Sequence, residues 1–173
     1  MDEFWETEVR ANKTRRKSLD GLNYITIPFN ALPMHVLTEN EKIMECHETL
    51  NELSKQPIVN LTGITNTELK LTYGAPNIKL LSEYDQRYTT LARTLQTFAE
   101  LLYENGHFPE ACTVLEFAVS THTDISASYR LLITIYEKLE RSDKISALLP
   151  VAENLRSGMK DSIVAMIQSA LTS

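Results

Sequence analysis

The chain has 173 residues, of which 43% are apolar and 23% charged, and its formal net charge at pH 7 is −6. This length suits one domain with a buried core and is too short for two full domains. The acidic balance argues against binding to nucleic acid, which normally needs a basic surface. No stretch approaches the roughly 18 to 20 continuous apolar residues of a membrane helix, so a cytoplasmic protein is expected.

The sequence lacks the patterns of metal sites and catalytic sites. Its two cysteines, Cys46 and Cys112, are interpreted as free buried thiols in a reducing compartment. Neither combines with a histidine at the paired spacing of a zinc site, and no local motif marks a serine or cysteine nucleophile. We therefore expect no metal, no cofactor and no enzymatic activity.

Residues 1–18 form a basic flank in an otherwise acidic chain. An aromatic pair, Phe4 and Trp5, precedes the basic cluster Arg10, Lys13, Arg15, Arg16 and Lys17. Aromatic side chains favour the bilayer interface, and cations favour its cytoplasmic side. Two interpretations therefore stay open: a solvated leader helix, or a tether to an anionic membrane surface whose anchor is missing here or supplied by a partner.

Residues 19–87 are predicted to form an N-terminal capping region that begins with an extended segment over 19–33. Thr38 and Glu41 have the spacing of a capping box, and the residues after them form one apolar stripe, so a helix is expected over 38–54. Alternating apolar residues on either side of a polar turn then indicate a small hairpin over 57–73, or an ordered loop.

Residues 88–173 have the apolar spacing of antiparallel helices. The first helix is expected to have its cap at Ser82 and to stop near Asn105-Gly106. The others are expected from Pro109, over 125–139, from Ser142, and as a last capping helix after Gly158. Pro150 lacks a backbone donor, so a bend is predicted in the fourth helix, after Ala147.

The helices from 88 to 157 repeat with a period of 34 residues. This shift places Leu95 on Tyr129, Phe98 on Leu132, Leu102 on Tyr136, Leu115 on Leu149 and Ala118 on Ala152. A constant period of this length is typical of stacked helical repeats. Such arrays require capping elements at their ends, so the region 19–87 and the last helix are expected to supply them.

The pattern resembles the tetratricopeptide repeat, with Leu95, Phe98-Ala99, Leu102, Ala111, Leu115 and Ala118 at signature positions and Gly106 at the turn. It departs from that family at Ile133 and Ile145, which replace small residues and should push paired helices apart. The expected fold is therefore mainly α, made of antiparallel helix pairs in an α-α superhelix, with an N-terminal helix and short strand segments as a cap. The whole layout also resembles uncharacterised proteins of Gram-positive bacteria.

The resemblance implies a non-enzymatic adaptor or scaffold that binds a peptide or protein in the groove made by the first helix of each unit. Carried over by position, the groove includes Glu104 and Lys138, and its candidate binding residues are Arg93, Gln96, Glu100, Tyr103, Arg130, Thr134 and Glu137. An arginine pair there would suit a carboxylate, and a tyrosine would offer a flat anchor. The alternative is a docking subunit of a membrane-associated assembly, with the basic flank at the bilayer and the repeats as a docking or homodimer surface.

Overall fold

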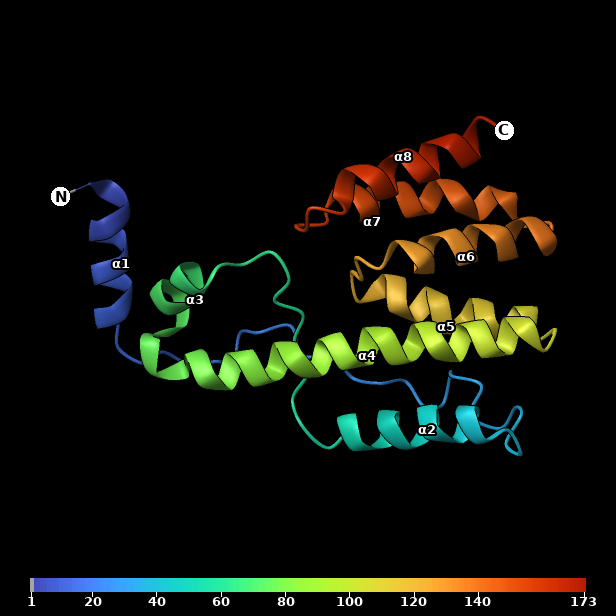
Figure 1. The fold of residues 1–173 in the computed structure, drawn as a ribbon, viewed down its shortest axis with the longest axis horizontal. Helices are drawn as coiled ribbons and strands as arrows, with labels where there is room; N and C mark the ends of the chain where they lie inside the picture. Colours follow the sequence, from blue (N-terminus) through green and yellow to red (C-terminus); the bar gives the residue numbers. More distant parts are fainter. Residues whose placement is uncertain (1) are drawn as a thin grey trace.

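Figure 1 shows the protein as a computed structural model that describes residues 2–173. These residues form eight α-helices with antiparallel pairings and contain no strands, so the mainly α fold is confirmed and the strand segments are not found. The helices are α1 (Glu3–Lys13), α2 (Glu41–Leu53), α3 (Asn66–Tyr73), α4 (Ile78–Glu104), α5 (Phe108–Ser120), α6 (Ser126–Lys138), α7 (Leu148–Glu153) and α8 (Lys160–Leu171). Two 3-10 helices, η1 (Ala75–Asn77) and η2 (Ser142–Ala147), precede α4 and α7.

Helices α4 to α8 stack one after another and reverse direction at each turn, while α2 lies along the other side of α4 (Figure 1). The predicted boundaries agree with this arrangement. Helix α4 ends at Glu104, and Gly106 follows with a φ of +79°, a conformation that glycine adopts without a steric cost. Pro109 stands in the first turn of α5, where its missing N–H has no partner to lose.

The fourth helix of the stack is divided at the place where the sequence predicts a bend. A 3-10 helix ends at Ala147, and the α-helical part runs only from Leu148 to Glu153. Pro150 lies in the first turn of this short helix, where no backbone donor is required. The change of helix type is how the chain accommodates the proline.

Two helix starts differ from the prediction. Helix α4 begins at Ile78 and not at Ser82, because Ile78, Leu81 and Tyr84 continue its apolar stripe backwards along the chain. Helix α2 has its cap at Asn40 and not at Thr38, since the Asn40 side chain accepts a hydrogen bond from the Ile43 N–H at 3.1 Å. In α4 the apolar spacing was the stronger start signal, and in α2 a polar side chain two residues later was the effective cap.

The hairpin predicted over 57–73 is wrong. Its second half is helix α3, which Thr65 and Glu68 start with a reciprocal capping box: each side chain accepts the other residue's N–H at 3.1 Å. A capping box fixes two donors at a helix start, which favours helix over strand in a short apolar run. The one pairing of strand type in the described chain is an isolated antiparallel bridge between Tyr24 and Val59.

Residues 14–17 of the basic N-terminal flank are held against the end of α3. The Ala75 N–H donates to the Thr14 carbonyl at 3.0 Å, and the Lys17 N–H donates to the Tyr73 carbonyl at 2.9 Å. Gly74 has a φ of +96°, and a Cβ atom there would lie 2.3 Å from the Arg15 carbonyl oxygen. Only glycine permits this close approach, which fixes residues 14–17 across the α3–α4 junction.

The core has two parts. The larger joins α2, α4, α5, α6, α7 and α8, and includes Leu95, Phe98, Leu115 and Tyr129 at the predicted repeat positions. The smaller joins α3, the first half of α4 and the extended segment, around Val59, Leu61, Leu69, Leu81 and Tyr84.

No helix of residues 2–173 is both long and apolar enough to cross a membrane.

His47 is a buried ionisable group between α2 and α4. Its side chain is 5% exposed, its Nε2 atom has no hydrogen-bond partner, and its ring meets the Phe98 ring edge-on at 5.3 Å. Burial lowers the pKa of His47 below its ordinary value of 6.5, because no neighbour compensates the lost hydration of the charged form. The α2–α4 contact therefore favours the neutral imidazole over the charged form.

We predict that this histidine makes the fold sensitive to acid. Above pH 6.5 the imidazole is neutral in both states, and below it the unfolded state binds the proton more readily, so stability is lost as the pH falls. Urea unfolding measured at about pH 7.5 and about pH 5.5 gives the free energy of unfolding at each pH. The decrease in this free energy between the two pH values should be smaller for His47→Leu than for the wild type. His35→Gln, at an exposed site, is the control, and its free energy of unfolding should decrease as much as that of the wild type.

Candidate functional site

The predicted groove lies between α4 and α6, which run parallel and touch each other. Gln96, predicted to face a partner, is instead 9% exposed and spans the two helices. Its amide donates to Glu100 at 2.8 Å, and its carbonyl oxygen accepts from the buried Ser128 hydroxyl at 2.6 Å. The side chain of Gln96 therefore joins α4 to α6 and is not free for a ligand.

A second link between the two helices lies farther along the same seam. The Tyr103 ring stands against the Phe108 ring at 5.1 Å, and the Lys138 ammonium lies 5.8 Å and 5.4 Å from the two ring centroids. Such cation–π contacts are attractive and are strongest when partly desolvated. Tyr103 is therefore half-buried and shared with Lys138.

The other predicted residues remain on the surface of this face. Arg93, Glu100, Arg130 and Glu137 are exposed, and Thr134 is half-buried with its hydroxyl donating to the Arg130 carbonyl. Within residues 2–173, neither arginine and neither glutamate takes part in an ion pair. We define the α4–α6 face by these exposed charges; it is held at two points by Gln96 and Tyr103.

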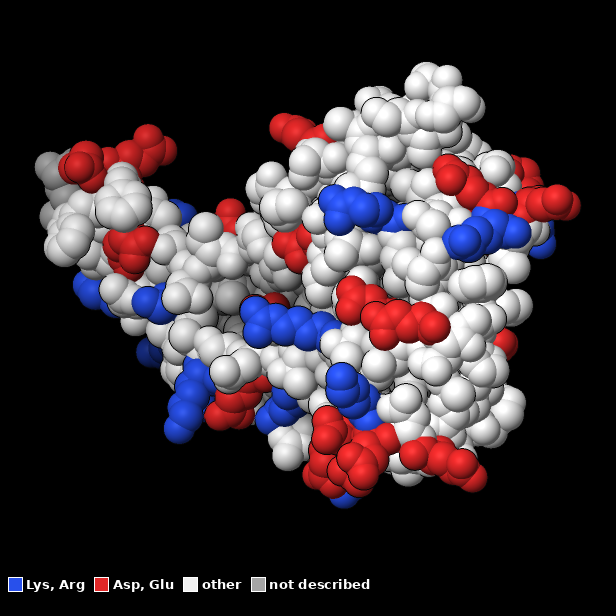
Figure 2. Space-filling model, turned by 45° about the vertical axis from the view of Figure 1, so that its right-hand side comes forward, with Lys and Arg blue, Asp and Glu red and all other residues white. Residues whose placement is uncertain are grey.

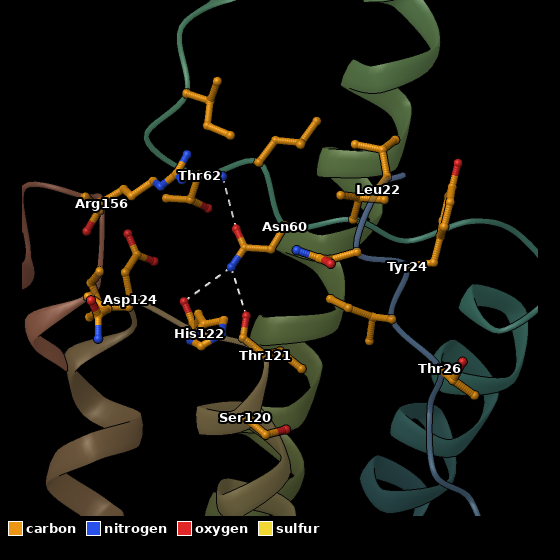
Figure 3. Close-up of a pocket in the computed structure, with 18 of the residues that line it drawn as sticks. Leu22, Tyr24, Thr26, Asn60, Thr62, Ser120, Thr121, His122, Asp124 and Arg156 are labelled. Carbon is orange, nitrogen blue, oxygen red and sulfur yellow. Dashed lines mark hydrogen bonds between the residues drawn. The ribbon is translucent and has the colours of Figure 1, made fainter. Parts of the chain in front are cut away.

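A cavity of about 680 Å³ lies elsewhere, between the extended segment and the ends of the stacked helices (Figure 3). Its walls come from five separate parts of the chain: residues 21–26, residues 59–64, Tyr73 at the end of α3, the end of α5 with the α5–α6 turn, and the α7–α8 loop. This volume is within the roughly 300 to 1,000 Å³ that is usual for small-ligand sites. None of the predicted groove residues lines it.

The floor of the cavity is the α5–α6 turn, whose carbonyl groups are capped by side chains from other elements. The Tyr88 hydroxyl of α4 donates to the Thr121 carbonyl at 3.1 Å, and the Tyr129 hydroxyl of α6 donates to the Thr123 carbonyl at 2.7 Å. The Asn60 amide reaches the Thr121 and His122 carbonyls at 2.9 and 3.2 Å. Burial raises the pKa of Tyr88 to about 12, so its hydroxyl stays protonated and remains a donor.

One end of the cavity is closed by direct contact between two loops. Gly63 has a φ of +83°, and a Cβ atom there would lie 2.6 Å from the Arg156 Cβ and 2.7 Å from its carbonyl oxygen. A side chain at position 63 would therefore separate the loops. This contact sets the position of Arg156 relative to the residues 59–64.

The mouth of the cavity has charged groups on one side and apolar groups on the other. Asp124 and Arg156 lie on the same side, across from Leu22 and Tyr24 (Figure 3). Neither charge belongs to an ion pair in the described part of the chain. Both are thus available to a ligand of opposite charge.

The chemistry that the described side chains offer is that of binding groups. No group of three or more His, Cys, Asp or Glu residues in the range 2–173 is placed to hold a metal ion. Both cysteines are free and buried, as predicted. Burial raises the pKa of Cys46, and it raises that of Cys112 to about 11, which disfavours the nucleophilic thiolate of each.

The cavity was not foreseen from the sequence. Its charged pair, Asp124 and Arg156, belongs to two different loops, and its apolar wall comes from a third segment near the N-terminus. The one sequence signal was the long irregular stretch after α2, since loops of that length are often functional or packed. No local motif connects these parts, because they meet only through helix packing.

Comparison with known proteins adds no identity: the chain matches no protein-family model, no curated protein and no solved structure. Any assignment of function therefore depends on the geometry of the α4–α6 face and of the cavity.

We predict that Tyr88 stabilises the cavity floor. Tyr88→Phe removes the hydrogen bond to the Thr121 carbonyl, which keeps the Asn60 amide as a donor, so the free energy of unfolding should fall by about 0.5 to 1.5 kcal/mol. The matched control is Tyr73→Phe, because the hydroxyl of the half-buried Tyr73 makes no hydrogen bond to any described residue. Urea denaturation followed by circular dichroism measures both. Equal losses in the two variants would contradict the capping role.

Proposed function

We propose that this protein is a non-enzymatic interaction module, an adaptor or scaffold that binds a peptide or protein partner on the α4–α6 face. The observation that carries the proposal is the row of exposed, unpaired charges of both signs on two parallel helices. Arg93 and Arg130 are suited to carboxylates, and Glu100 and Glu137 to cationic side chains. The antiparallel helix pairs from α4 to α7 support the resemblance to the tetratricopeptide repeat, which implies a binding surface on the first helix of each pair.

The fixed position of α4 relative to α6 supports the proposed role as an interaction module. The Gln96–Ser128 hydrogen bond and the Tyr103–Lys138 contact hold α4 and α6 together at two points, so the exposed charges keep a fixed spacing. A pre-organised surface loses less conformational entropy when a partner binds. Charges of both signs, which are also mixed on the face that Figure 2 shows, favour a specific protein surface over a polyanion.

Charge reversal on this face should weaken partner binding. The variant Arg93→Glu/Arg130→Glu is expected to reduce capture of specific partners from cell extract about tenfold, because each reversal replaces an attraction with a repulsion. Lys42→Glu/Lys79→Glu changes the net charge equally at exposed sites outside this face and is the control. Quantitative mass spectrometry compares the yields. Identical partners at identical yield with the Arg93→Glu/Arg130→Glu variant would rule out the α4–α6 face.

A second candidate function is docking to an anionic membrane surface through α1. This helix projects from the body, and Phe4 and Trp5 on it are 71% and 55% exposed. The basic residues that follow, Arg10 and Lys13 in its last turn and Arg15 and Arg16 after it, are exposed as well. Exposed aromatic side chains beside cations are typical of interfacial segments.

The single tryptophan gives this second function a direct readout. On addition of vesicles with about 30% phosphatidylserine, Trp5 fluorescence should shift to the blue and intensify, since the indole enters the interface. High salt should reverse the shift by screening the cations. Unchanged fluorescence at low salt would exclude membrane docking through α1. The Met159→Ser/Leu171→Ser variant, which removes exposed apolar residues elsewhere, should behave like the wild type.

A further inference from the structure

The cavity combines two unpaired charges with an apolar wall on a fixed floor. Asp124 and Arg156 stand on the same side of it and yet form no ion pair with each other. A ligand group that satisfied both would need a cation and an anion close together. The α-ammonium and α-carboxylate of a free amino acid are attached to one carbon and meet this requirement.

The opposite wall specifies the rest of the ligand. Leu22, Tyr24 and Ile64 line the cavity, and none of them is fully buried, so each has apolar surface left to cover. A large apolar side chain on the ligand would remove this surface from water, at a gain that grows with the area buried. The cavity volume of about 680 Å³ leaves room for an aromatic side chain.

We propose that the cavity binds a free α-amino acid with a large apolar or aromatic side chain. Arg156 pairs with its carboxylate, where a guanidinium makes two parallel hydrogen bonds. Asp124 pairs with its ammonium group, and the side chain lies against Leu22 and Tyr24. The close contact between Gly63 and Arg156 fixes the backbone of Arg156 beside the cavity, and the capped α5–α6 turn fixes the backbone of Asp124. This site is separate from the α4–α6 face, so its failure leaves the proposed adaptor function untouched.

The test compares L-phenylalanine with two derivatives, each of which lacks one of its two charges. L-phenylalanine, N-acetyl-L-phenylalanine, which lacks the ammonium, and L-phenylalaninamide, which lacks the carboxylate, are titrated to about 10 mM into the ¹⁵N-labelled full chain, a range that detects millimolar affinity. L-phenylalanine should shift the amide signals of Asn60, Thr62, His122 and Arg156. Each derivative should bind about tenfold more weakly. Glycine, which has no side chain for the apolar wall, should also bind more weakly.

Two variants assign the charges. Asp124→Asn should make L-phenylalanine bind no better than its N-acetyl form, and Arg156→Gln should make it bind no better than its amide. The controls Asp161→Asn and Arg141→Gln alter exposed charges outside the cavity and should leave all affinities unchanged. Circular dichroism confirms that each variant is folded.

Three results would overturn the proposal. The first is no shift of the cavity amides by L-phenylalanine at the highest concentration. The second is equal binding of all three ligands, which would show that the protein recognises neither the ammonium nor the carboxylate of the ligand. The third is a loss of binding in the control variants as large as in Asp124→Asn and Arg156→Gln, which would mean that only the overall charge matters.

Discussion

The uninterrupted helix α4 is the constraint on which the rest of the structure depends. Its 27 residues extend about 40 Å at the rise of an α-helix, long enough to contact two separate clusters of apolar side chains. The first half meets α3 and the extended segment, and the second half meets α2 on one side and α5 on the other. If α4 began at Ser82, the smaller cluster would lose the helical turn that carries Leu81 and Ile78. The length of α4 therefore makes the N-terminal region part of the same domain as the stacked helices.

A polar counterpart to this apolar framework lies at the α5–α6 turn. Helix ends leave carbonyl groups without partners, and here Tyr88, Tyr129 and Asn60 supply donors from three different elements. The cost of burying a tyrosine hydroxyl or an amide is offset by these bonds. Because the donors come from α4, α6 and the 59–64 loop, the turn fixes how these elements meet. The cavity results from that fixed geometry. The charged residues on its walls are Asp124 and Arg156, and neither of them forms an ion pair with another described residue.

Much of the fold could be predicted because its signals are local. Asn105-Gly106 set the end of α4, Pro109 set the start of α5, and Pro150 set the division of the fourth helix. The errors arose where two local signals competed. Alternating apolar residues suggested strands over 57–73, but the capping box of Thr65 and Glu68 started a helix in the same run. Position along the helix correctly placed Arg93 and Arg130 on the surface, but it could not show that Gln96 turns inward to meet Ser128, since that bond needs α6 beside it.

The sequence by itself determined the helices, their order and their buried stripes, because the 3.6-residue period and the turn residues act over a few positions along the chain. It also determined that four charged residues of α4 and α6 stay on the surface. Only the tertiary structure decided which surfaces remain open to a ligand. Gln96 and Tyr103 were drawn into contacts between helices, while Asp124, Arg156 and Tyr24, far apart in the chain, were gathered around one cavity. The physical reason is that a binding site depends on the distance between side chains from separate elements, which packing fixes and local sequence does not.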